Sequence, residues 1–141
     1  MKIVVGTYDG GLMGWESDFS ADPSGRTLHL TYAFAAHDGT VRALCLDGYD
    51  NASLVSGGSD ETIRVYNLKR HKEVGTLLEH KSAVTALAFF RGSHLLSGSA
   101  DGAVCAWQVS EWLCLDSMRG HRCVHMRRIL CAALSQYGRP L

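Results

Sequence analysis

A segment of thirteen residues occurs three times in this chain and constrains its fold more than any other feature. Residues 54–66 (LVSGGSDETIRVY) align without a gap on residues 95–107 (LLSGSADGAVCAW), at an offset of 41. Residues 3–15 (IVVGTYDGGLMGW) form a third copy. In each copy an aspartate precedes the last aromatic residue by six positions: Asp9 and Trp15, Asp60 and Tyr66, Asp101 and Trp107. A fixed period of this kind indicates repeated structural units.

A second element repeats upstream of the later two copies. His37 is followed at +4 and +7 by Val41 and Leu44, as His80 is by Val84 and Leu87. Apolar and polar residues alternate after each histidine. The segments between the apolar runs contain Gly, Ser, Asp and Asn, which favour turns. This pattern predicts four short strands in each period. A period of 41 to 43 residues with a histidine at the start and an aromatic residue near the end is typical of a WD40 propeller blade.

The sequence therefore predicts an all-β chain, an incomplete WD40 β-propeller of about three blades built from antiparallel four-stranded sheets. Residues 1–121 form the partial propeller, with a partial blade over 1–36 and blades over 37–79 and 80–120. Residues 16–26, with Pro23 and Gly25, predict a loop. Residues 122–141 form a divergent tail, for which the apolar spacing over 126–134 predicts either a short helix or a disordered segment. Propellers close with four to eight blades, so we expect a truncated product of a longer gene.

The repeated polar residues predict a structural network. A neutral imidazole has one donor and one acceptor nitrogen, so it can join an aspartate to a serine hydroxyl, which can accept from an indole N–H. The residues are His37, Ser56, Asp60 and Tyr66 in one period, His80, Ser97, Asp101 and Trp107 in the next, and Asp9 and Trp15 in the first. Tyr66 lacks the indole donor, so only the third period carries the whole set.

Two chemical interpretations compete with this one. His80, Ser97 and Asp101 resemble a hydrolase triad, but the same set stands one period earlier, and a nucleophilic site is not normally installed in each repeat. Cys114, His121, Cys123, His125 and Cys131 lack the paired spacing of zinc ligands. We expect no catalytic residue, metal or cofactor.

Composition points to an ordinary globular protein. Hydrophobic residues make up 46% of the chain, and its net charge is zero. A neutral balance disfavours non-specific binding to nucleic acid or to anionic membranes. The chain has no long apolar segment at its start, and its five cysteines are irregularly spaced. We therefore expect an intracellular protein with reduced thiols.

The chain resembles the amino-terminal blades of the p21-activated kinase-interacting protein 1 family of WD40 proteins. The resemblance covers about residues 1–121 and rests on HLLSG at 94–98, on Asp101-Gly102, Trp107 and WLCL at 112–115, and on SDETIRVY at 59–66. It implies a protein-binding adaptor that restrains p21-activated kinase through the regulatory region of the kinase. It also implies a nucleolar role with pre-ribosomal factors in large ribosomal subunit biogenesis. The chain lacks the later blades and the lysine-rich tail of that family.

Three functional hypotheses follow. The first is a protein-binding scaffold of this family. The second is a truncated product that is non-functional or competes with the longer propeller. The third, a hydrolase that uses Ser97, His80 and Asp101, is a remote alternative.

Overall fold

The computed structural model describes residues 2–17, 27–48 and 52–120 and contains three antiparallel β-sheets. The first sheet consists of β1 (Lys2–Gly6), β2 (Gly11–Ser17) and β3 (Leu28–Ala35). The second consists of β4 (Val41–Leu46), β5 (Ser53–Gly58), β6 (Ile63–Asn67) and β7 (Lys72–Leu77). The third consists of β8 (Val84–Phe90), β9 (His94–Ser99), β10 (Ala103–Gln108) and β11 (Leu113–Arg119). These sheets confirm the all-β, antiparallel prediction.

Each sheet follows the order of the chain, so every strand pairs with its neighbour in sequence. The alternating residues after His37 and His80 form β4 and β8, and the strand burial in β8 alternates between its two faces as a period of two requires. The predicted loop over 16–26 is wrong at its start, because Glu16 and Ser17 belong to β2 and Glu16 pairs with Lys2 of β1. Residues 18–26 and the predicted helix over 126–134 lie outside the described residues.

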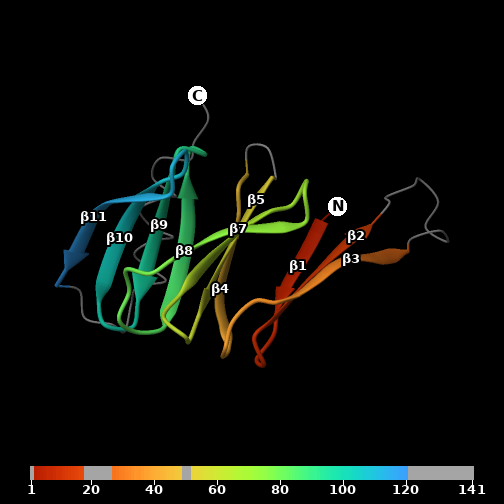
Figure 1. Ribbon diagram of the computed structural model, residues 1–141, viewed down its shortest axis with the longest axis horizontal. Coiled ribbons are helices and arrows are strands. Elements are labelled where there is room, and N and C mark those ends of the chain that lie inside the picture. The colour runs from red at the N-terminus through yellow and green to blue at the C-terminus, as the bar shows by residue number, and fades with distance from the viewer. Residues whose placement is uncertain (1, 18–26, 49–51, 121–141) are drawn as a thin grey trace.

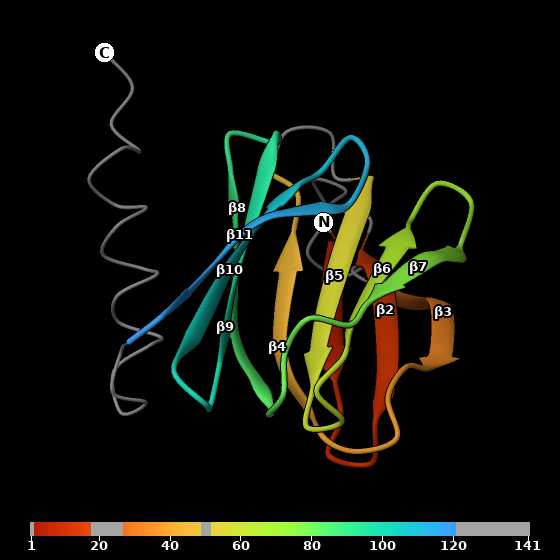
Figure 2. The ribbon, with the colours of Figure 1, turned by 60° about the vertical axis from the view of Figure 1, so that its left-hand side comes forward.

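The three sheets stand side by side, with the second between the first and third (Figures 1 and 2). One cluster of buried side chains fills each gap. Between the first and second sheets lie Leu12, Ala36, Leu54, Tyr66 and Leu68. Between the second and third lie Val55, Ile63, Val65, Leu77, Val84, Leu95, Cys105 and Trp107. The stability of the chain therefore rests on stacking between successive sheets, as in other repeat proteins.

Two glycines allow this close stacking. A Cβ added to Gly57 of β5 would lie 2.5 Å from Val84 Cγ1 and 2.8 Å from Val84 Cβ on the next sheet. Gly6 of β1 has the same relation to Val41 of β4. Both glycines stand at the same position of the repeat, so the two gaps between sheets share one packing geometry.

Candidate functional site

The histidine network of the second sheet is complete from the aspartate to the serine. His37 lies in the segment that leads into β4, and Asp60 lies in the turn between β5 and β6. His37 Nδ1 is 2.9 Å from Asp60 Oδ1, and His37 Nε2 is 2.7 Å from Ser56 Oγ. A carboxylate only accepts hydrogen bonds, so Nδ1 donates to Asp60 and the Ser56 hydroxyl donates to Nε2 of the neutral ring. The imidazole of His37 thus joins the segment before β4 to the turn between β5 and β6 and to strand β5.

Asp60 is held by further donors. The hydroxyl of Thr62 donates to Asp60 Oδ1 over 2.9 Å, and the backbone N–H of Asp38 donates to Oδ2 over 3.1 Å. Burial favours the protonated carboxyl, but the hydrogen bonds from Thr62 and His37 outweigh it and lower the pKa of Asp60. The network ends at Ser56, because the buried hydroxyl of Tyr66 has no hydrogen-bond partner.

In the third sheet the network joins the tryptophan, the serine and the histidine, and the contact between histidine and aspartate is absent. Trp107 Nε1 donates to Ser97 Oγ over 2.8 Å, and the Ser97 hydroxyl lies 2.7 Å from His80 Nε2, to which it donates. His80 Nδ1 is buried and has no hydrogen-bond partner, so the predicted link from His80 to Asp101 is wrong. Burial lowers the pKa of His80. Asp101 instead accepts from the backbone N–H of Ala103 over 2.9 Å.

Two substitutions between the repeats accompany this difference: Ser99 in place of Gly58, and Ala103 in place of Thr62, whose hydroxyl donates to Asp60. Gly58 adjoins the contact between His37 and Asp60, and a Cβ at this position would lie within 2.7 Å of His37 Cγ and closer still to Asp60 Oδ1. Ser99 stands at the matching position of the third sheet, where its hydroxyl donates to Ser82 O over 3.0 Å. The side chain of Ser99 occupies the place that Gly58 leaves open. The difference between Gly58 and Ser99 is one signal in the sequence that distinguishes the two networks.

The first sheet contains no such network among the described residues. Asp9 is exposed and accepts a hydrogen bond from the hydroxyl of Thr7, which is the largest cause of its lowered pKa. Val5 stands where the other copies have serine, so no hydroxyl is available to accept from the indole of Trp15. The structure does not join Asp9 to Trp15.

The geometry around Ser97 differs from that of a hydrolase. A nucleophilic serine must reach its substrate, and its histidine must be oriented by a third group. Ser97 has no exposed surface, its oxygen already accepts from Trp107, and Nδ1 of His80 meets no carboxylate. These contacts suit a buried link between strands and not an attacking group.

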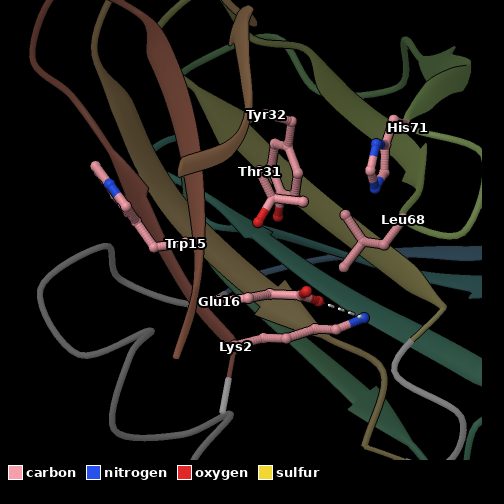
Figure 3. Close-up of a pocket in the computed structure, with 7 residues that line it drawn as sticks. All are labelled: Lys2, Trp15, Glu16, Thr31, Tyr32, Leu68 and His71. Carbon is pink, nitrogen blue, oxygen red and sulfur yellow. Dashed lines mark ion pairs between the residues drawn. The ribbon is translucent and has the colours of Figure 1, made fainter. Parts of the chain in front are cut away.

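The described residues line one open hollow of about 360 Å³, beside Cys45, Phe89 and Arg91, but they hold no metal-ligand cluster. No three His, Cys, Asp or Glu side chains gather as metal ligands in the described part of the chain. Of the cysteines and histidines weighed as a zinc cluster, only Cys114 falls within it, as a free thiol. A small cavity of about 10 Å³ lies between the first and second sheets, near Tyr32, Leu68 and His71 (Figure 3). That volume is about one water molecule.

The turns form one edge of the molecule, which we call the turn rim. It comprises residues 7–10, 37–40, 59–62, 80–83 and 99–102, which follow the lower edge of the molecule in Figure 1. Backbone hydrogen bonds fasten each turn to the linker beside it, for example Val41 N to Thr7 O at 3.1 Å and Ser59 N to Thr40 O at 2.9 Å. Tyr8 is 87% exposed on this rim.

Acidic side chains predominate on the turn rim. Its five segments hold one lysine, Lys81, and five carboxylates: Asp9, Asp38, Asp60, Glu61 and Asp101. A rigid acidic surface with an exposed tyrosine suits recognition of a basic protein segment.

The described residues include no helix of the length and apolarity that crossing a membrane requires. The WD domain, G-beta repeat family model matches residues 27–67 and 71–108. The chain belongs to the WD40 repeat family.

Among its relatives, the chain is similar to a p21-activated protein kinase-interacting protein 1-like protein of Gallus gallus, with 35% identity over 122 residues. It is also similar to Protein MAK11 of Saccharomyces cerevisiae, with 31% identity over 141 residues. The matches cover 86% and 85% of this chain but 31% and 33% of those proteins. The chain thus spans about a third of the length of the curated relatives it matches.

A solved structure of U3-55K shares the fold, with a TM-score of 0.72 and 24% sequence identity. The match covers 85% of this chain and 36% of that one.

Proposed function

We propose that this chain is a protein-binding WD40 module that contacts the regulatory region of a p21-activated kinase and restrains its activation. The observation that carries this proposal is the 35% identity over 122 residues to a relative named for its interaction with that kinase. In this proposal the turn rim is the contact surface, because backbone hydrogen bonds fasten its turns, Tyr8 is exposed on it, and its acidic side chains outnumber its basic ones. The histidine networks serve structure, since they fix the turns and strands that present the rim.

A role in large ribosomal subunit biogenesis, with pre-ribosomal factors as partners and the nucleolus as location, belongs to the same proposal. Its support is the resemblance of residues 1–121 to the kinase-interacting family. A tagged chain expressed in cells tests this role: we expect it to retain large-subunit precursor proteins and to concentrate in nucleoli. Uniform distribution without those proteins would contradict it.

Direct binding tests the kinase role. The purified chain is titrated with the kinase regulatory region, and affinity is measured by calorimetry. Tyr8→Ala combined with Asp38→Lys changes the rim without touching a buried side chain, and we expect it to weaken binding at least tenfold. Val74→Ser changes a residue of β7 that is 55% exposed away from the rim, and it serves as the matched control. Equal affinity of both variants would exclude the rim, and no binding by the unaltered chain would reject the kinase role.

A protein that competes with its relatives for the same partner is the second candidate, because it shares 35% identity over 122 residues with one of them. Such a chain binds the kinase region without restraining the kinase. A kinase assay separates the two functions: the adaptor lowers activation when added alone, whereas the competitor reverses the inhibition caused by a full-length relative.

A further inference from the structure

The outer strand of the first sheet differs in charge from the other two outer strands. β3, β7 and β11 each pair with one strand among the described residues and form the outer margin of their sheets. β7 contains Lys72 and Glu73, and β11 contains Asp116 and Arg119. β3 has the sequence LHLTYAFA and contains no lysine, arginine, aspartate or glutamate. Charged residues on an edge strand oppose its pairing with another chain, so β3 lacks the protection that β7 and β11 have.

The outer position in the sheet is enough to expose these strands. The second sheet lies between the other two, yet Val74 and Thr76 of its outer strand are exposed (Figure 1). On β3, Ala33 and Ala35 are likewise exposed. β3 is eight residues long, and no other described strand is longer. The edge of β3 is therefore long and uncharged, and its accessibility does not depend on how many sheets stack beside it.

Backbone groups of β3 are oriented for pairing along this edge. Ala36 N donates to Gly10 O, next to β2, over 2.9 Å. Alternate residues of an antiparallel strand direct their N–H and C=O to opposite sides, so Ala33 and Ala35 direct theirs away from β2. A bulge leaves Thr31 without a partner on β2, so the regular part of β3 begins at the next residue.

Aromatic rings hold this regular part of β3 against the second sheet. The rings of Tyr32 and Phe34 are stacked with their centroids 5.3 Å apart, and Phe34 is stacked on Tyr66 of β6 at the same distance. Tyr66 is itself buried. The edge is therefore fixed before a second strand arrives, which lowers the entropy cost of pairing.

A basic turn adjoins β3 at the end of the molecule opposite the turn rim. The turn between β6 and β7 exposes four consecutive residues: Lys69, Arg70, His71 and Lys72. The ring of His71 lies 5.7 Å from the ring of Tyr32 (Figure 3). Oδ1 of Asn67 accepts from the backbone N–H groups of Lys69 and Arg70, each over 3.0 Å, so the turn is held in one conformation.

The other end of β3 leads into the acidic turn rim. Asp38, three residues after β3, is exposed, and the rim holds five carboxylates and one lysine. If two copies of β3 pair antiparallel, the acidic rim of each copy lies beside the basic turn of the other. The zero net charge of the chain adds no long-range repulsion between copies. This charge complementarity selects a second copy of the chain as the occupant of the edge.

We propose that the free edge of β3 is a homodimer interface, along which β3 of a second copy pairs antiparallel. In the arrangement centred on Phe34, Ala33 of each copy lies opposite Ala35 of the other, and each such pair exchanges two main-chain hydrogen bonds. The same patch serves both copies, as a two-fold axis requires. The interface lies on an outer strand and not on the turn rim, so it goes beyond the proposed kinase contact.

Sedimentation velocity of the purified chain over a wide range of concentration tests the interface. We expect a reversible equilibrium of monomer and dimer, which added salt shifts toward monomer because charges of opposite sign face each other. Hydrogen exchange followed by NMR locates the contact. We expect the amides of Ala33 and Ala35 to exchange more slowly in the concentrated sample than in the dilute one.

A proline substitution tests the main-chain hydrogen bonds. Ala33→Pro removes an N–H that faces the second copy, and proline is tolerated on an edge strand where that N–H has no partner in the same sheet. Ala33→Val keeps the N–H and is the matched control. We expect Ala33→Pro to raise the dissociation constant of the dimer at least tenfold and Ala33→Val to leave it unchanged.

Charge reversal tests the interface with exposed residues outside the strand, so it applies even if the proline variant does not fold. Arg70→Glu combined with Lys72→Glu makes the basic turn acidic, and we expect dimerisation to weaken. Addition of Asp38→Lys restores opposite charges across the interface and should recover part of the loss.

Three results would overturn the proposal. The first is a monomer at every concentration. The second is equal dimerisation of Ala33→Pro and Ala33→Val, or slowed exchange at β7 or β11 instead of β3. The third is slow exchange of Ala33 and Ala35 in the dilute monomer, which means that another segment of the same chain already holds the edge.

Discussion

Gly58 and Ser99 stand at the same position of successive repeats, yet they leave their histidines in different states. At Gly58 the ring of His37 reaches Asp60, whereas at Ser99 the Nδ1 of His80 stays without a partner. The absence of a Cβ at Gly58 leaves room for the contact between His37 and Asp60, and the hydroxyl of Thr62, which Ala103 lacks, supports it. The effect is local, because both rings retain a 2.7 Å contact with serine.

Exchange of these residues should exchange the two arrangements. Ser99→Gly opens the space between His80 and Asp101, so the carboxylate approaches the ring and the pKa of His80 rises. NMR titration of the His80 ring protons measures this shift. Gly58→Ser places a side chain against His37 and Asp60, and we expect it to destabilise the fold by about 1–3 kcal/mol. An unchanged His80 titration in Ser99→Gly would show that the serine side chain is not what separates the pair.

The acid sensitivity of the fold should follow His80. Burial depresses the pKa of His80 below its ordinary value of 6.5, so the unfolded chain binds more protons than the folded one near this pH. Stability is then present above pH 6.5 and is lost as the pH falls toward the folded pKa, by at most about 1.4 kcal/mol per pH unit for one proton. Urea unfolding between pH 7 and pH 5 measures the slope. His80→Gln removes the titrating group and should flatten it; an equal slope in this variant would assign the sensitivity elsewhere.

The two aromatic residues at the ends of the networks should respond differently to loss of their polar groups. Trp107→Phe removes the indole donor to Ser97 and leaves a gap, so we expect a loss of about 1–3 kcal/mol in the free energy of unfolding. Tyr66→Phe removes a buried hydroxyl that has no partner, so its effect should be neutral or stabilising by up to about 1 kcal/mol. Chemical denaturation measures both. A larger loss for Tyr66→Phe than for Trp107→Phe would contradict the assigned contacts.

At the scale of strands, the sequence predicts pairing well and side-chain links less well. The bounds of β4 and β8 match the alternating runs. In β8 alternate residues are buried, so a slip by one residue would expose them. The extension of β2 through Ser17 is set by pairing with β1 and β3, which local turn signals do not report. The missing bond between His80 and Asp101 coincides with differences at two other positions, Ser99 for Gly58 and Ala103 for Thr62. A pattern of matched His, Ser and Asp residues does not report such differences between their neighbours.

Close stacking of strands on neighbouring sheets should make Gly57 sensitive to the smallest substitution. Gly57→Ala places a methyl group against Val84, and we expect a loss of about 1–3 kcal/mol by thermal or chemical denaturation. Gly75→Ala in β7 is the matched control, since a Cβ there meets nothing within 4 Å and the change should be neutral or slightly stabilising. Combination of Gly57→Ala with Val84→Ala should recover part of the loss. Failure to do so would mean that the strain lies in β5 itself.

At the scale of the whole molecule, stability should be distributed according to the number of neighbours of each sheet. The second sheet has a sheet on both sides, and β5 and β6 are almost wholly buried. The first sheet has one neighbour, and β1 and β3 are largely exposed or half-buried. Sheets that contact only their neighbours can open separately, with the least supported unit opening first.

Hydrogen exchange measured by mass spectrometry resolves this order. We expect peptides from β1 and β3 to exchange at least tenfold faster than peptides from β5 and β6, which corresponds to about 1.4 kcal/mol in opening free energy. Leu12→Ala removes a fully buried side chain between the first and second sheets, so it should speed exchange in β1–β3 and leave β9 and β10 unchanged. If Leu12→Ala accelerated hydrogen exchange equally in all three sheets, the sheets would unfold together as one cooperative unit.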